Sequence, residues 1–311
     1  MKNPTGLILF ILMVSSISLF AQKEEVLILA TEDINIEGTL LIPVSEKKIP
    51  VVLFISGSGP TDRDGNNRLM KNNSLKMLAT GLAESGIATL RYDKRGVGKS
   101  AGDGVDESEL RFNDYIDDAA LWIDYLNNDD RFNEVMVLGH SEGSLIGMVA
   151  SQNHAVTKFI SLAGVGEPAN KIIRQQLEKL PSEIQQQANP ILEKLETGGQ
   201  VDDVPMPLYS LFRPDVQPYL ISWFKYDPKE ELAKLKIPIL ILQGTSDIQV
   251  DVSNAEFLGA ANERAKVEII EGMNHVLKQS ELDQQSNLLT YNNPDLPLSD
   301  GVIEILTRFI Y

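Results

Sequence analysis

Short apolar runs alternate with amphipathic stretches along most of this chain. The runs are rich in β-branched residues and are bounded by turn formers, as Val51–Ile55 is by Pro50 and Ser56–Pro60. This alternation predicts an α/β fold, a mostly parallel sheet with helices on both faces. The expected strands are 26–30, 34–42, 51–55, 88–92, 135–139, 159–163, 237–243 and 266–270, the first two antiparallel, and the expected helices are 74–85, 111–127, 144–152, 253–261 and 298–310.

The alternation stops between about residues 167 and 235, where Gln, Glu and Pro become frequent. Helical patterns at 172–180 and 184–195 predict a helical insertion over 167–235, which caps a core built from residues 22–166 and 236–311. Five aromatic residues of this insertion either line a pocket or form its own small core: Tyr209, Phe212, Tyr219, Trp223 and Phe224.

The first 21 residues have the pattern of a secretory signal peptide. Lys2 precedes a short apolar stretch that ends near Ala21, and charged residues follow at once. We therefore expect cleavage after residue 21, export to the periplasm or outside the cell, and no stable membrane insertion of the mature chain. An uncleaved N-terminal anchor is the competing interpretation.

The composition excludes several kinds of partner and of catalytic or metal site. The 311 residues carry a net charge of −16 and include no cysteine. The negative charge disfavours nucleic acid as a partner. The lack of cysteine excludes a thiol nucleophile, disulfides and Cys-based zinc sites. The number of subunits in the functional protein does not follow from the sequence.

The strongest chemical signal is the motif Gly-His-Ser-Glu-Gly at residues 139–143, which follows an apolar strand and precedes a helical run. A sharp strand-to-helix turn exposes the serine and requires flanking glycines. The sequence therefore nominates Ser141 as nucleophile and the backbone N–H of Glu142 as an oxyanion donor. The alternative is a plain tight turn, against which the neighbouring strand and helix argue.

A serine nucleophile needs a general base, and the chain has only three histidines. His140 lies inside the motif and is expected to be a packed, hydrogen-bonded structural residue. His154 follows the next helix and is expected at the surface. His275 comes directly after the last predicted core strand, which makes it the candidate base.

The orienting acid is expected in the loop after the strand at 237–243. Asp247 lies four residues beyond that strand, from where its carboxylate can reach the loop of His275. Asp251 is better interpreted as the cap of the next helix. Glu167, after the preceding strand, is the alternative acid.

The order Ser141, Asp247, His275, the motif at 139–143 and the turn at 92–100 resemble the α/β-hydrolase superfamily. Within it, the chain is similar to the branch of bacterial esterases, monoacylglycerol lipases and serine aminopeptidases. The resemblance implies an α/β-hydrolase fold with a helical cap and a second oxyanion donor in the loop at 55–65. Ser58 aligns with that donor, whereas Ser56 replaces a histidine usual in the family.

These residues predict hydrolysis of short- to medium-chain carboxylic esters through an acyl-enzyme, with no metal or organic cofactor. Three alternatives stay open: a serine aminopeptidase on small peptides, an acyltransferase, and a non-catalytic binding protein on a hydrolase scaffold. Retention of all three candidate triad residues favours an enzyme.

Overall fold

The computed structural model describes residues 22–102 and 105–311. The predicted signal peptide therefore lies outside the described residues. Among the helices that are described, none is both long and apolar enough to cross a bilayer.

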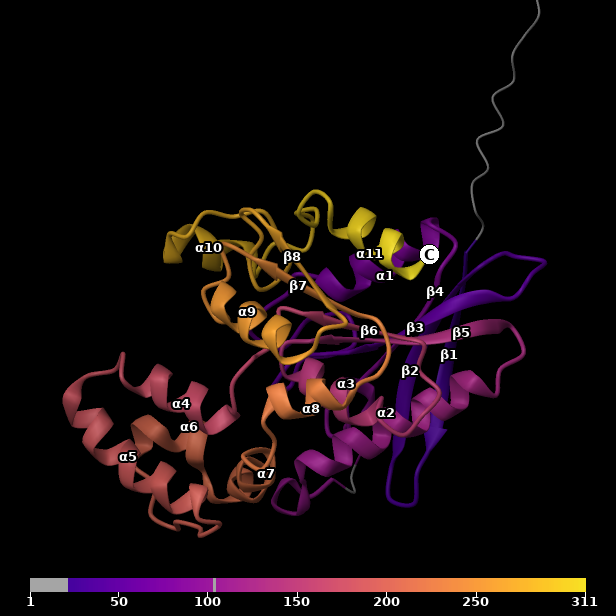
Figure 1. Ribbon diagram of the computed structural model, residues 1–311. Coiled ribbons are helices and arrows are strands. Elements are labelled where there is room, and N and C mark those ends of the chain that lie inside the picture. Colours follow the sequence, from indigo (N-terminus) through magenta and orange to yellow (C-terminus); the bar gives the residue numbers. More distant parts are fainter. Residues whose placement is uncertain (1–21, 103–104) are drawn as a thin grey trace, which may run out of the picture.

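Eight strands form one sheet in the order β1-β2-β4-β3-β5-β6-β7-β8 (Figure 1). The strands are β1 (Gln22–Ala30), β2 (Asn35–Pro43), β3 (Ile49–Ile55), β4 (Ala88–Tyr92), β5 (Phe132–His140), β6 (Lys158–Leu162), β7 (Ile239–Gly244) and β8 (Ala265–Ile270). β2 pairs antiparallel with β1 and β4, and all other pairs are parallel. The mostly parallel sheet predicted from the apolar runs is confirmed.

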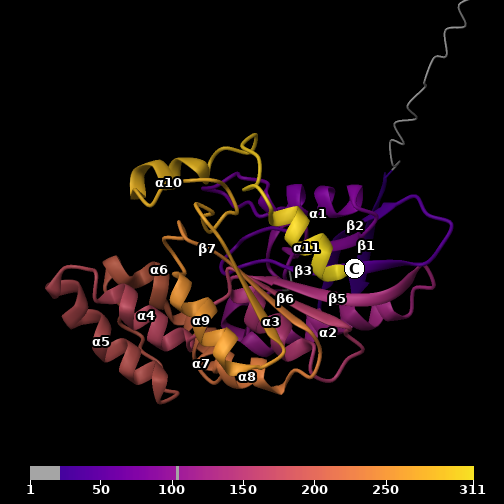
Figure 2. The same cartoon turned by 45° about the horizontal axis from the view of Figure 1, so that its top comes forward.

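Helices cover both faces of the sheet (Figures 1 and 2). Alternate residues of the central strand β3 point to opposite faces of the sheet. Val51 and Leu53 belong to the buried cluster on one face, and Val52 and Phe54 belong to the cluster on the other. On the Val52 side lie α1 (Ser74–Glu84) and α11 (Val302–Ile310), and on the Val51 side lie α2 (Phe112–Asn127), α3 (Glu142–Ala150), α8 (Pro228–Lys234) and α9 (Val252–Ala261).

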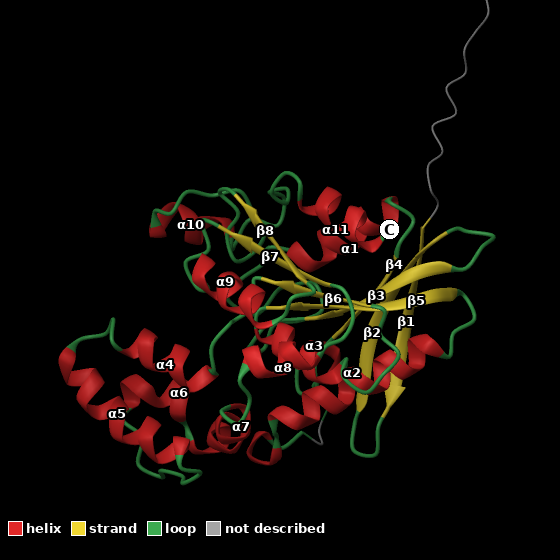
Figure 3. Cartoon of the chain, in the orientation of Figure 1, coloured by secondary structure: helices red, strands yellow, loops and turns green. Residues whose placement is uncertain are grey.

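Residues between β6 and α8 form a cap of helices and loops beside the sheet (Figure 3). Its helices are α4 (Ala169–Leu177), α5 (Ser182–Glu196), α6 (Tyr209–Phe212) and α7 (Gln217–Trp223), with 3₁₀ turns at 206–208 and 214–216. The Trp223 ring stacks on Phe112 of α2, with 5.7 Å between ring centroids. The Phe112 N–H donates to Ser222 Oγ at 2.8 Å. These contacts fix α7 to the core.

Three features differ from the expected elements. α8 falls inside the predicted insertion, yet it packs against the core helices α3 and α9. The last helix, α11, starts at Val302 rather than at residue 298. Gly301 has a φ of 84°, which lies outside the helical region, so the helix begins only after this residue. The short helix α10 (Gln284–Thr290) was not predicted.

Candidate active site

Ser141 lies at the turn between β5 and α3 in a strained backbone conformation, with φ 56° and ψ −122°. Glycines on both sides make that turn possible. A Cβ on Gly139 would lie 2.2 Å from the Gly143 carbonyl oxygen, and a Cβ on Gly143 would lie 2.3 Å from the Ile55 carbonyl oxygen. No other residue fits either position. The turn therefore has the geometry that the motif at 139–143 predicts.

His275 and Asp247 form a buried pair at the same edge of the sheet. His275 Nδ1 lies 2.8 Å from Asp247 Oδ2. The other carboxylate oxygen accepts the N–H groups of Gln249 and Val250 at 2.8 and 2.9 Å. Burial raises the pKa of Asp247, but the His275 ring and these N–H groups outweigh burial and lower it overall. Asp247 is thus a fully bonded carboxylate that orients the imidazole.

Two loops must meet to form that pair, and the chain holds them together tightly. Gly244 ends β7 so close to the β8 loop that a Cβ there would lie 2.0 Å from the Met273 carbonyl oxygen. The Ser246 N–H donates to the same oxygen at 3.0 Å. From α10, the Asn287 amide donates to the Ser246 carbonyl at 2.7 Å and accepts a bond from Asn274. Sequence reasoning missed both asparagines.

The alternative candidates occupy other roles. The Asp251 side chain accepts the Ser253 N–H at 2.9 Å and caps α9, as expected. Glu167 accepts a hydrogen bond from Gln175 at 2.9 Å. Asp247 is the acid that pairs with His275.

His140 is buried and supports the loop of His275. Its Nε2 lies 2.9 Å from the His275 carbonyl oxygen. Burial lowers the pKa of His140 to about 3, so the ring is neutral at pH 7. A carbonyl can only accept, so the proton of the neutral ring is on Nε2. The structural role predicted for His140 is confirmed, and His154 pairs with Asp124 near the surface.

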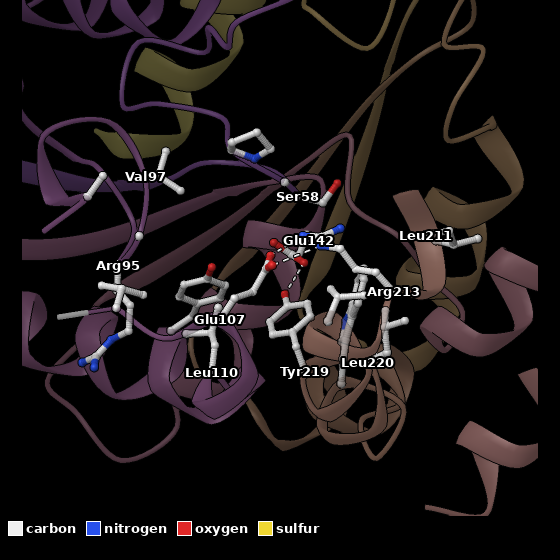
Figure 4. Close-up of a pocket in the computed structure, with 18 of the residues that line it drawn as sticks. Ser58, Arg95, Val97, Glu107, Leu110, Glu142, Leu211, Arg213, Tyr219 and Leu220 are labelled. Atoms are coloured by element: carbon white, nitrogen blue, oxygen red, sulfur yellow. Dashed lines mark hydrogen bonds and ion pairs between the residues drawn. The ribbon is translucent and has the colours of Figure 1, made fainter. Parts of the chain in front are cut away.

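Ser141 and His275 line a common cavity of about 140 Å³, together with Gly57, Ser58 and His140. A second cavity of about 240 Å³ extends from Ser141 under the cap. Its apolar lining comes from both core and cap: Leu145, Val165, Ile172, Ile173, Leu220, Trp223 and Val250. A third cavity, of about 550 Å³, is also lined by Glu142 (Figure 4).

Ser58 and Glu142, the predicted oxyanion donors, lie at the junction of these cavities. Ser58 lines all three, and Glu142 lines the two larger ones. Across the described part of the chain, neither backbone N–H donates to another protein group. Gly57 lets this loop approach Ser141, because a Cβ there would lie only 3.2 Å from Ser141 Cβ.

The loop that carries Ser58 is fixed by an ion pair that sequence reasoning did not find. Asp93 Oδ1 accepts the Arg63 backbone N–H at 2.7 Å, and Oδ2 accepts the Arg63 guanidinium at 2.8 Å. Oδ2 also accepts the Lys99 N–H at 2.8 Å. Asp62 accepts the N–H groups of Asp64 and Asn66, and thereby shapes the loop. No group of three potential metal ligands occurs among residues 22–102 and 105–311.

Both carboxylate oxygens of Glu142 have hydrogen-bond partners, whereas its backbone N–H has none among the described residues. Lys94 Nζ lies 2.8 Å from Glu142 Oε2, and both side chains are buried. Tyr219 of α7 donates to Glu142 Oε1 at 2.5 Å (Figure 4). The Glu142 carboxylate is therefore not free to bind the amino group of a peptide substrate.

Four of the five aromatic residues of the insertion take one of the two expected roles, and Tyr209 takes neither. Tyr219 and Trp223 line the cavities of the site. Phe212 is fully buried in the apolar core of the cap, and Tyr209 is 45% exposed. Phe224 packs against the same apolar cluster and lines none of the three cavities.

Comparisons with known proteins find similarity to hydrolases and esterases. Residues 71–210 match the family model described as serine aminopeptidase, S33. The chain is 27% identical to Esterase EstD of Thermotoga maritima over 259 residues, 79% of this chain but only 59% of that protein.

Among solved structures, Est1E of Butyrivibrio proteoclasticus with bound ferulic acid is similar at a TM-score of 0.59 and 19% identity, covering 91% of this chain and 96% of that one. The esterase EaEST of Exiguobacterium antarcticum gives a TM-score of 0.54 and 18% identity, covering 91% and 98%.

Proposed function

We propose that the chain is an α/β hydrolase, which its similarity to the family model and to esterases supports, and that it is a serine hydrolase of carboxylic esters with short- to medium-length acyl chains. One observation carries the proposal. A serine in a strained strand-to-helix turn lines the same cavity as a histidine whose other ring nitrogen is bonded to a buried carboxylate. Nucleophilic acyl transfer needs this combination.

In the proposed reaction, Ser141 Oγ attacks the ester carbonyl carbon while His275 Nε2 takes its proton. Asp247 stabilises the imidazolium that forms. The N–H groups of Ser58 and Glu142 donate to the developing oxyanion. His275 then protonates the departing alkoxide, which leaves as an alcohol, and water releases the acid from Ser141 by the same steps in reverse order.

The cavities suggest how the substrate lies. The 240 Å³ cavity is lined by Ser141 and is mostly apolar, so we assign it to the acyl chain. The 550 Å³ cavity is larger, and the Arg213–Glu107 pair lies among its lining residues (Figure 4). We assign it to the alcohol portion.

Ser141→Ala tests the proposal, with p-nitrophenyl esters of increasing acyl length as substrates. We expect kcat to fall by at least about 10⁴-fold. The melting temperature should stay near that of the wild type, because only one hydroxyl is lost. Substantial residual hydrolysis by the folded variant would contradict the assignment.

An aminopeptidase is the second candidate, because Glu167 lines the cavity of Ser141 and could bind a substrate ammonium. Aminoacyl p-nitroanilides distinguish the two functions. An esterase hydrolyses them poorly, whereas a peptidase hydrolyses them and loses affinity for them on Glu167→Gln.

A further inference from the structure

Lys94, two residues beyond β4, is one of the most deeply buried charged side chains of the protein, with 1% of its surface exposed. Its ammonium group makes three contacts. Nζ donates to the Gly57 carbonyl at 2.7 Å and to Glu142 Oε2 at 2.8 Å, and it lies 4.8 Å from the centroid of the Tyr115 ring. A buried lysine with these partners is held in one place.

The Gly57 carbonyl is the other half of the peptide group whose N–H belongs to Ser58. Because the peptide group is planar and trans, its C=O and N–H point in opposite directions. An ammonium group that binds this carbonyl therefore fixes the direction of the Ser58 N–H. It also polarises the amide, which strengthens the N–H as a donor.

The Glu142 carboxylate links Lys94 to the residue that carries the second oxyanion donor and to helix α7 of the cap. Glu142 supplies its own N–H at the start of α3, while its Oε2 binds Lys94 and its Oε1 accepts from Tyr219 of α7. Burial and the neighbouring Glu142 raise the pKa of Tyr219, so its hydroxyl stays protonated and donates.

We propose that Lys94 and the Glu142 side chain are positioning residues that align the two oxyanion donors, and that Tyr219 makes this alignment depend on the docking of α7. The proposal rests on the serine hydrolase function proposed above. The cap then does more than enclose the substrate, because a displaced α7 removes a donor from Glu142 and weakens catalysis at Ser141.

A purely structural role explains the pair less well. Two charges taken out of water cost free energy that their attraction often fails to return, and apolar replacements are frequently neutral or stabilising. Lys94 moreover binds the carbonyl of the peptide group that carries one assigned oxyanion donor, and it binds the side chain of the residue that carries the other. A role in aligning the two N–H groups accounts both for the burial of the Lys94 and Glu142 side chains and for their position.

The test is the double variant Lys94→Met/Glu142→Gln, which removes both charges and leaves neither one buried alone. With p-nitrophenyl butyrate we expect kcat to fall about 10- to 100-fold and KM to change by less than about 2-fold. An alkyl trifluoromethyl ketone, which forms an oxyanion when Ser141 adds to it, should lose affinity in proportion to kcat/KM. Lys94→Arg keeps the charge and should recover much of kcat.

Lys158→Met is the matched control, because Lys158 Nζ also binds backbone carbonyls, those of Phe309 and Ile310, at the far end of β6. It should keep kcat. Tyr219→Phe should lower kcat about 3- to 10-fold alone, and should have a smaller effect in the double variant, since a neutral amide oxygen there replaces the carboxylate that accepts from Tyr219.

Two results overturn the proposal alone: wild-type kcat in the double variant, or a rise in KM at unchanged kcat. If the wild type neither hydrolyses esters nor reacts with the ketone, the hydrolase function itself is wrong, and this proposal falls with it.

Discussion

His140 and Asp247 are both buried in the site, and burial acts on each by disfavouring its charged form. For His140, bonded to a backbone carbonyl, burial dominates and the pKa falls to about 3. For Asp247, bonds from the His275 ring and two backbone N–H groups outweigh burial and lower the pKa. The interior thus keeps one group neutral and the other ionised.

The depressed pKa of His140 predicts a pH-dependent stability. The unfolded chain takes up a proton at its ordinary pKa of 6.5, and the folded chain only near 3. Stability is therefore complete above pH 6.5 and is lost as the pH falls toward 3. At about pH 4.5 the loss should reach roughly 2–3 kcal/mol.

Urea unfolding at pH 7 and at about pH 4.5 measures this loss. His140→Gln keeps an amide donor for the His275 carbonyl but cannot titrate, so its stability should fall less on acidification. His154→Gln controls for the loss of an imidazole near the surface. An equal fall in wild type and His140→Gln would contradict the prediction.

At the scale of elements, the strands could be predicted because buried parallel strands are continuous apolar runs. α10 could not, because it has little apolar pattern to signal it: Leu288 and Leu289 are 47% and 70% exposed. Its contribution is polar, through Asn287.

The turn at 139–143 could be predicted from its motif, because the chemistry and the backbone geometry of this turn depend on neighbouring residues in the sequence. The Lys94–Glu142 pair could not, because no local pattern links residues 48 positions apart.

Asn287→Ala tests whether α10 holds the two loops of the site together. The change leaves the buried Ser246 carbonyl without its donor, which should cost about 1–3 kcal/mol. Displacement of Asp247 relative to His275 should lower kcat by about 10-fold. Ser286→Ala, on the exposed part of the same helix, should change neither. Unchanged kcat in a destabilised Asn287→Ala would show that α10 is only structural.

At the scale of the molecule, the cap lies beside the sheet (Figure 2), and cap residues share the wall of a cavity with Ser141. The position of an insertion was predictable from the break in alternation. The pocket was not, because each cavity wall combines side chains from distant segments. Export of the chain stays a prediction, which N-terminal sequencing of the mature protein from a producing cell would check.

Ile172 of α4 tests the assignment of the 240 Å³ cavity to the acyl chain. Ile172→Trp fills part of this cavity, so kcat/KM for p-nitrophenyl octanoate should fall by at least about 10-fold relative to the acetate. Lys171→Trp, on the exposed neighbour, is the control. A parallel change for both esters in Ile172→Trp would place the acyl chain elsewhere.

The account depends most on an activated Ser141, which a fluorophosphonate probe measures directly. The probe reacts only with a serine whose proton a base removes, and peptide mass spectrometry locates the adduct. We predict stoichiometric labelling on the peptide that contains Ser141, which is lost in Ser141→Ala and strongly slowed in His275→Ala. A folded wild-type protein that stays unlabelled, or is labelled on another serine, would contradict the proposed mechanism.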